Sequence, residues 1–99
     1  MEELSVYLFY DIEDDGIRNK VSETCKDYGL KRIQFSGFFG SLDRNKREEL
    51  FLKLSHILKN KEGKILLLPV CEKDMRSRKE ILNKAVKKES IKENASTEG

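Results

Sequence analysis

Acidic residues gather directly after the apolar run near the N-terminal end of the chain. Asp11 is the first charged residue after the segment from Leu4 to Tyr10, at the tip of a predicted strand. A carboxylate in such a place suits a hard cation such as Mg²⁺, which binds oxygen ligands and keeps several waters. One carboxylate is too few for a metal site, but two copies of the chain facing each other across a dimer axis can share one ion. A turn or capping aspartate is the other interpretation that the residue type allows.

Three further acidic residues follow at once: Glu13, Asp14 and Asp15. Carboxylates are favoured at helix N-termini, where the helix dipole places a partial positive charge. We therefore assign these three residues to capping the helix that follows, with any contribution to a metal site secondary.

Basic residues form a second candidate group, for contact with nucleic acid. Arg18 and Lys20 lie two positions apart near the start of a predicted helix, so they do not share one helical face. Lys31 and Arg32 open the next predicted strand. Arginine holds a phosphate with a bidentate fork, whereas lysine attracts it as a point charge. Solvated surface charge and phosphate contact both stay open for these four residues, and phosphate contact would weaken steeply with salt.

Phe38 is the aromatic candidate for nucleic-acid binding, on the same predicted strand face as Arg32. It is suited either to stack on a nucleobase or to pack, and packing is the better supported of the two. The chain has one histidine, His56, which falls on a predicted helix surface. No histidine base is therefore predicted near Asp11, and no serine has the partners of a nucleophile.

The elements that position these residues follow from hydrophobic periodicity. Residues 4–10 alternate with both faces largely apolar, as in a central strand covered on both sides. A helix capped by Asp14 or Asp15 follows, and Gly29 ends it in the left-handed conformation. Residues 31–42 predict two short strands, with glycines marking the bend between them.

A second helix and a last strand complete the predicted domain. The helix is capped by Ser41 or Asp43. Its apolar stripe recurs at helical spacing: Leu50, Phe51, Leu54, Ile57 and Leu58. Residues 64–71 predict a strand in which Pro69 lacks a ladder donor, which places the end of this strand at a sheet edge. The order β-α-β-β-α-β is the ferredoxin-like α+β sandwich, with two helices on one face of an antiparallel sheet.

The opposite face of this sheet needs a cover of its own. If the helices lie over Val6 and Leu8, the alternation of the strand exposes Tyr7 and Phe9 on the other face. An aromatic sheet face usually meets a second copy of the chain or a ligand. We therefore expect a homodimer.

Length and composition predict one small domain, since the chain has 99 residues, 38% charged and 37% hydrophobic. We assign residues 1–78 to the ferredoxin-like domain and residues 79–99 to an edge strand or helix followed by a charged tail that is predicted to be disordered. A net charge of +2 neither favours nor excludes nucleic acid. No apolar run reaches the ~20 residues of a bilayer span, and Cys25 and Cys71 lack a CxxC spacing. We therefore expect a cytoplasmic protein with reduced thiols and no membrane contact.

Two segments of the chain together resemble a known family. The first, from Val6 to Lys20, holds the apolar strand that ends in Asp11 and the start of the basic helix. The second reads Arg32-Ile33-Gln34-Phe35-Ser36, with Phe38 two positions on. In this order and spacing they resemble the CRISPR-associated protein 2 family, the small subunit of the spacer-acquisition machinery, over roughly residues 4–72.

The resemblance implies a homodimer in which Asp11 is catalytic and binds Mg²⁺, with one ion shared across the dimer axis. It implies that Arg18 leads a basic pair whose second residue, often arginine, is Lys20 in this chain. It also implies a short edge strand at residues 78–82 that pairs with the partner subunit. The implied partners are DNA or RNA and the integrase subunit CRISPR-associated protein 1, two pairs of which the dimer bridges.

Two classes of function follow for a protein of antiviral defence. The first is a subunit of the spacer-integration complex that is also a slow, Mg²⁺-dependent endonuclease on single-stranded RNA or double-stranded DNA. The second is a structural DNA-binding adaptor without catalysis. A toxin-type ribonuclease of the virulence-associated protein D kind shares the fold class and is a third alternative, which the neighbouring genes would distinguish.

Overall fold

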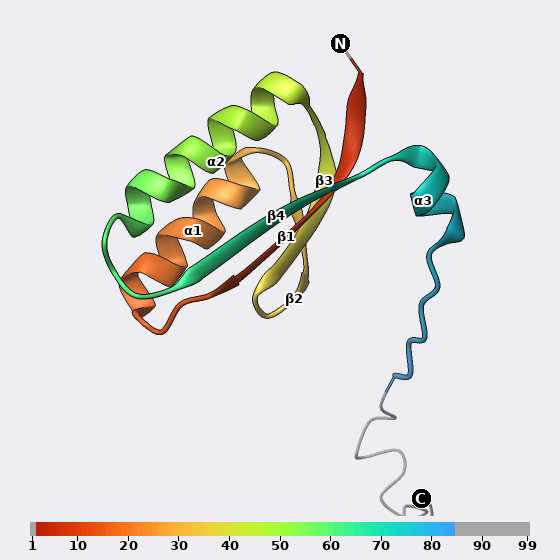
Figure 1. The fold of residues 1–99 in the computed structure, drawn as a ribbon. Helices are drawn as coiled ribbons and strands as arrows, with labels where there is room; N and C mark the ends of the chain where they lie inside the picture. Colours follow the sequence, from red (N-terminus) through yellow and green to blue (C-terminus); the bar gives the residue numbers. More distant parts are fainter. Residues whose placement is uncertain (1, 85–99) are drawn as a thin grey trace, which may run out of the picture.

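The structure is a computed structural model and describes residues 2–84. This part of the chain folds into four strands and three helices. Figure 1 shows the elements in chain order: β1 (Glu3–Asp11), α1 (Asp15–Asp27), β2 (Lys31–Gln34), β3 (Gly37–Asp43), α2 (Arg44–Leu58), β4 (Lys64–Val70) and α3 (Glu72–Ser77). The strands form one sheet in the order β2-β3-β1-β4, and every pair is antiparallel. The ferredoxin-like β-α-β-β-α-β prediction is confirmed, and the short helix α3 is an addition to it.

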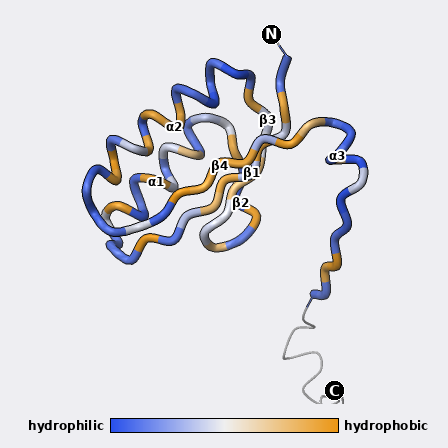
Figure 2. The backbone as a smooth tube through the Cα atoms, in the orientation of Figure 1, coloured by the Kyte–Doolittle hydropathy of each residue, from blue (hydrophilic) through white to orange (hydrophobic). Residues whose placement is uncertain are grey.

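The core lies between one face of the sheet and the helices α1 and α2 (Figure 1). Val6 and Leu8 of β1 are fully buried there, together with Leu50 and Leu54 of α2. Each such side chain contributes about 1.5–3 kcal/mol relative to an exposed one. Phe51, which the periodicity included in the stripe of α2, is 46% exposed, because it lies at the border of that stripe. Figure 2 shows the apolar residues running along β1 and β4.

The ends of both long helices are set by local side-chain chemistry. The Asp14 carboxylate accepts a hydrogen bond from the backbone N–H of Ile17 at 2.9 Å, so Asp14 is the cap of α1. Asp43 caps α2 in the same way through the N–H of Lys46 at 2.8 Å. Gly29 follows α1 with a φ of 84°, the left-handed conformation that glycine adopts without strain. The predicted capping pattern is therefore confirmed, with Asp14 and Asp43 as the capping residues.

The face of the sheet opposite α1 and α2 carries a cluster that we call the aromatic face, made of Tyr7, Phe9, Phe39, Leu66 and Leu68. Tyr7 lies opposite Phe39 and Leu68 in the strand register, and Phe9 lies opposite Leu66. The rings of Tyr7 and Phe39 have centroids 4.8 Å apart. Leu66 and Leu68 are 45% and 46% exposed. The prediction that Tyr7 and Phe9 point away from the helices is confirmed.

The C-terminal region differs from both alternatives given for it. β4 lies at the sheet edge, as Pro69 predicted, and α3 ends at Ser77. Residues 78–84 form neither strand nor helix, so a helix through them is wrong. Residues 78–82 form no strand in this chain, and the edge strand predicted there pairs with a partner subunit. That pairing and the domain boundary after residue 78 stay predictions.

The predicted disordered tail falls largely on residues 85–99, which lie outside the described part of the chain. Among residues 2–84, no helix combines the length and the apolar character that crossing a bilayer requires.

Candidate functional site

Asp11 ends β1 at the rim of the aromatic face. Because side chains alternate along a strand, Asp11 shares its face with Phe9 and Tyr7. It is exposed and lies opposite Lys64 in the register of β1 and β4. A small pocket of about 260 Å³ contains Asp11 and Lys64 together with Phe9 and Leu66 of the aromatic face. Any molecule that covers the aromatic face would therefore contact the Asp11 carboxylate.

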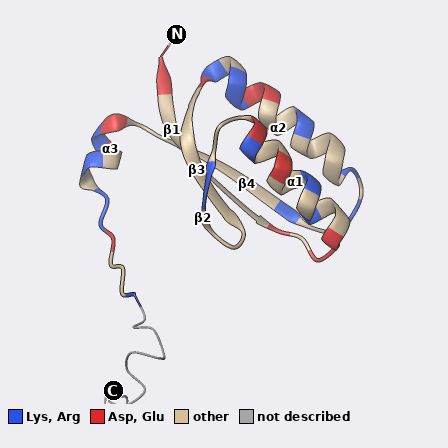
Figure 3. Cartoon of the chain, turned by 180° about the vertical axis from the view of Figure 1, so that it is seen from behind, with Lys and Arg blue, Asp and Glu red and all other residues tan. Residues whose placement is uncertain are grey.

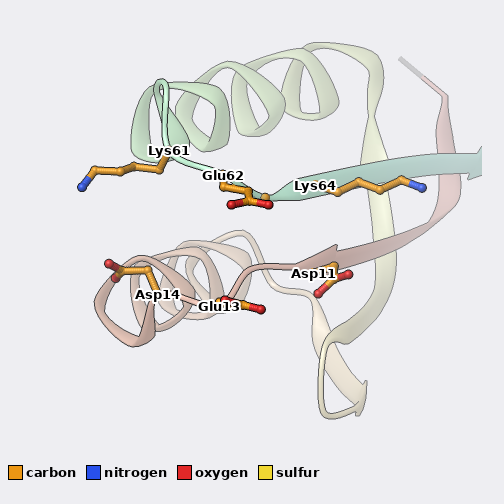
Figure 4. A pocket seen from close by; sticks show the side chains of 7 residues that line it. Asp11, Glu13, Asp14, Lys61, Glu62 and Lys64 are labelled. Carbon is orange, nitrogen blue, oxygen red and sulfur yellow. The ribbon is translucent and has the colours of Figure 1, made fainter.

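A larger pocket of about 460 Å³, which we call the Asp11 pocket, opens at the end of the strand. It is lined by Asp11, Glu13, Asp14, Lys61, Glu62, Gly63 and Lys64. Figure 4 shows that Lys61 and Asp14 point to one side of this pocket and Lys64 to the other. Acidic and basic side chains thus line the same opening, and they come from the β1–α1 connection and from the approach to β4.

The carboxylates of one chain do not fit a closed metal site. One oxygen of Asp14 is held as the cap of α1, and Asp15 is paired with Arg18. Residues 2–84 contain no group of three His, Cys, Asp or Glu side chains placed to hold an ion. Asp11 offers an exposed carboxylate at the rim of the aromatic face, so the residues that the structure describes fit part of an ion site shared between two copies.

Arg18 braces the backbone that follows Asp11. Its Nη1 donates to the carbonyl oxygens of Ile12 at 3.0 Å and Glu13 at 3.2 Å. Its Nη2 donates to the carboxylate of Asp15, and its guanidinium carbon lies 5.7 Å from the ring centroid of Phe35. The side chain is 26% exposed. Most of its donors therefore serve the β1–α1 connection, while its predicted contact with phosphate stays a prediction.

Arg32 joins the β2–β3 hairpin to α1. Its Nη2 donates to the hydroxyl of Ser22 at 2.7 Å, and its Nη1 donates to the carbonyl oxygen of Phe35. Its guanidinium carbon lies 5.0 Å from the ring centroid of Phe38. Phe38 has no exposed surface and belongs to the core. The prediction that Phe38 contacts nucleic acid is wrong, because its register opposite Leu8 turns the ring toward the helices.

The two lysines among the predicted phosphate ligands are exposed and lie on different elements. Lys31 stands on the edge strand β2 opposite Phe39, whereas Lys20 of α1 lines a pocket with His56 and Lys61. Their phosphate contacts stay predictions. The structure thus brings Arg18 and Arg32 together at Phe35, whereas Lys31 lies on β2 of the same hairpin and Lys20 lies apart from it.

Sequence reasoning missed the residues that precede β4. The pattern assigns Lys64 only to the start of a strand and gives no functional role to Lys61 and Glu62, yet all three line the Asp11 pocket. The signal that identifies them is the antiparallel pairing of β4 with β1, since it sets the start of β4 beside the end of β1.

Comparison with known proteins places this geometry in a family. Residues 5–78 match the family described as CRISPR associated protein Cas2. The chain belongs to the Cas2 family. This membership makes it a CRISPR-associated protein and favours that interpretation over the toxin-type alternative.

Relatives within the Cas2 family are similar over most of the chain. The CRISPR-associated endoribonuclease Cas2 of Desulforudis audaxviator is 54% identical over 72 residues, which are 73% of this chain and 68% of the relative. The CRISPR-associated endoribonuclease Cas2 of Korarchaeum cryptofilum is 37% identical over 78 residues, 79% of this chain and 84% of the relative. Among solved structures, the hypothetical protein TT1823 from Thermus thermophilus matches with a TM-score of 0.70 and 27% identity, over 83% of this chain and 93% of that one. The ferredoxin-like fold of this chain is thus shared with solved structures.

Proposed function

We propose that this Cas2-family protein is a homodimeric, Mg²⁺-dependent endonuclease in which Asp11 is the catalytic residue and the metal ligand. The observation that carries the proposal is the exposed Asp11 carboxylate at the rim of the aromatic face. The names of the two relatives as endoribonucleases support single-stranded RNA as the substrate, with double-stranded DNA as the alternative. The two cysteines of the chain, Cys25 and Cys71, are free thiols, which supports action in the cytoplasm.

The proposed dimer is supported by the aromatic face. Leu66 and Leu68 are almost half exposed on a strand where neighbouring apolar rings already gather. Exposed apolar patches of this kind mark interaction surfaces. A twofold axis through such a face uses the same surface of both copies. For two Asp11 carboxylates to hold one ion, this axis has to pass beside Asp11 at the end of β1.

The chain's own residues have defined parts in the proposed reaction. Mg²⁺, when bound, supplies positive charge that stabilises the negative charge developing on the phosphodiester during hydrolysis. Arg18 holds the carbonyl groups of Ile12 and Glu13 and so fixes the backbone that carries Asp11. Lys64 adds a positive charge opposite Asp11. Because residues 2–84 of each chain hold no group of three metal-ligating side chains at this rim, we expect slow turnover.

The second candidate function is a DNA-binding adaptor without catalysis. In that role the dimer bridges two pairs of the integrase subunit CRISPR-associated protein 1 within the spacer-integration complex. One observation favours it, namely that residues 2–84 hold no three-ligand metal cluster. The two functions are compatible in one protein, so the experiment has to measure cleavage and binding together.

The test compares wild type with Asp11→Asn on single-stranded RNA and duplex DNA, in Mg²⁺ and in EDTA. Asp27→Asn, an exposed change at the end of α1, is the matched control. We expect Mg²⁺-dependent cleavage that falls at least about 100-fold in Asp11→Asn and is kept in the control, the scale of losing one electrostatic group at a reaction centre. Equal cleavage by all three proteins would refute the role of Asp11. Salt-sensitive duplex binding without any cleavage would leave the adaptor function.

A further inference from the structure

A second cavity, of about 480 Å³, lies next to the Asp11 pocket and is lined by basic side chains. We call it the lysine groove, and its lining residues are Asp14, Ile17, Lys20, His56, Ile57, Lys59 and Lys61. They come from the start of α1, the end of α2 and the turn after α2. Figure 3 shows the turn that follows α2 coloured as basic. Two segments distant in sequence, residues 14–20 and 56–61, thus place positive charge around one opening.

The lysines of this groove have no acidic partner within the described part of the chain. None of Lys20, Lys59 and Lys61 has a carboxylate oxygen within 4.0 Å there, whereas Lys26 and Lys46 pair with Glu23 and Glu49. The one carboxylate in the groove, Asp14, accepts the capping hydrogen bond of α1. The groove therefore carries an excess of positive charge that is open to an anion.

Helix stabilisation accounts for part of this cluster only. Cations near a helix C-terminus are favoured by the helix dipole, which explains Lys59 at the end of α2. Lys20 stands in the second turn of α1, beyond the reach of this effect, so the dipole does not account for it. Lys61 lies beyond the end of α2, in the turn before β4. An anionic ligand accounts for all of these cations at once.

The lysine groove is continuous with the Asp11 pocket. Asp14 and Lys61 line both cavities. Figure 4 shows these two side chains pointing to the same side, away from Asp11. A chain of phosphates bound in the lysine groove therefore passes Lys61 and arrives at Asp11. The carboxylates of the Asp11 pocket repel phosphate, so the lysines have to supply the attraction.

The size and lining of the groove favour a single strand. Its volume of about 480 Å³ is that of a small-molecule site, which suits a few nucleotides of a flexible backbone. The apolar part of its lining is Ile17 and Ile57, with no aromatic ring on which a base would stack. Binding there therefore reads the phosphate backbone and not the base sequence.

We propose that Lys20, Lys59 and Lys61 bind the phosphodiester backbone of a single-stranded RNA and lead it to Asp11. The proposal rests on the proposed function, since it names the path of the substrate to that site. Lys20 was among the predicted nucleic-acid ligands, and the structure supplies Lys59 and Lys61 as its neighbours. Duplex DNA is the competing ligand that the test has to distinguish.

The test measures binding of a fluorescent oligouridylate in EDTA over a series of salt concentrations. The groove variant is K20Q/K59Q/K61Q, and the matched control, K26Q/K46Q/K73Q, removes three lysines that do not line the groove. Each phosphate contact on a single strand contributes a slope of about −0.7 in a plot of log K against log salt. We expect the groove variant to lose about 2 units of slope and at least about tenfold in affinity at low salt, with the control unchanged.

The outcomes distinguish this proposal from the proposed function. Equal RNA binding by the groove variant and the control would overturn the proposal, as would a loss confined to duplex DNA. Because binding is measured in EDTA, the result does not depend on cleavage. If Asp11→Asn cleaves like wild type while the groove variant loses RNA binding, the proposed function fails and the groove stands. Circular dichroism checks that both triple variants are folded.

Discussion

Replacing Arg18 with alanine tests whether this side chain braces the Asp11 backbone or binds phosphate. The change removes two hydrogen bonds to the carbonyl groups of Ile12 and Glu13, the ion pair with Asp15 and the contact with the Phe35 ring. Each carbonyl bond contributes about 1 kcal/mol to the free energy of unfolding. The exposed ion pair contributes about 0.5 kcal/mol, and the cation–π contact about 0.5 kcal/mol.

We therefore expect Arg18→Ala to lower the free energy of unfolding by about 2–3 kcal/mol. For a domain of this size such a loss lowers the melting temperature by about 10 °C or more. Lys20→Ala is the matched control, because Lys20 is exposed and has no ion pair or hydrogen bond of this kind within residues 2–84. We expect it to change stability by at most about 0.5 kcal/mol.

The assay pairs thermal unfolding at one fixed protein concentration with RNA binding over a salt series. If Arg18 mainly stabilises the backbone after Asp11, Arg18→Ala unfolds at a lower temperature than wild type. The slope of its RNA-binding constant against salt concentration then stays that of wild type. Lys20→Ala in contrast keeps its melting temperature and loses about 0.7 units of slope. The reasoning is refuted if Arg18→Ala melts within about 2 °C of wild type and loses salt slope, because Arg18 would then act mainly on phosphate.

Two further predictions concern the core and the aromatic face. Burial raises the pKa of Cys25 to about 12, against a partial lowering by Arg32. The folded protein therefore keeps the thiol proton of Cys25 above pH 9, where the unfolded chain loses it. As a result, the free energy of unfolding falls as the pH rises from about 9 toward 12, by at most about 1.4 kcal/mol per pH unit. Urea unfolding at several pH values should show this loss in wild type and less of it in Cys25→Ala, and parallel curves would contradict it. Leu68 lies on the aromatic face, so Leu68→Asp should convert a dimer to a monomer in sedimentation experiments. Leu52→Asp, on the exposed side of α2, should leave the dimer intact. A dimer in both variants would show that the interface lies elsewhere.

The features that could be predicted are those that short stretches of chain decide. The alternation from Leu4 to Tyr10 and the caps at Asp14 and Asp43 depend on neighbouring residues only, and the structure confirms each of them. Gly29 is a further case, because a helix end in the left-handed conformation selects glycine locally. The order of elements follows from such signals, and with it the ferredoxin-like fold.

Phe38 shows where local pattern stops being sufficient. The pattern placed it on one face with Arg32, and the structure confirms that pairing, since Arg32 lies over its ring. Alternation does not tell which face the helices cover. That depends on the register of β3 against β1, in which Phe38 lies opposite the buried Leu8.

The sequence by itself determined the two long helices and the four strands, their order, the Cas2-family resemblance and Asp11 as the candidate site. Tertiary structure decided which neighbours those residues have. In the folded chain, Arg18 donates to backbone carbonyl groups and Arg32 donates to the hydroxyl of Ser22. Lys61 lines both the Asp11 pocket and the lysine groove. The physical reason is that helix caps and strand alternation act over a few residues, whereas these contacts join segments that only the pairing of β1 with β3 and β4 brings together.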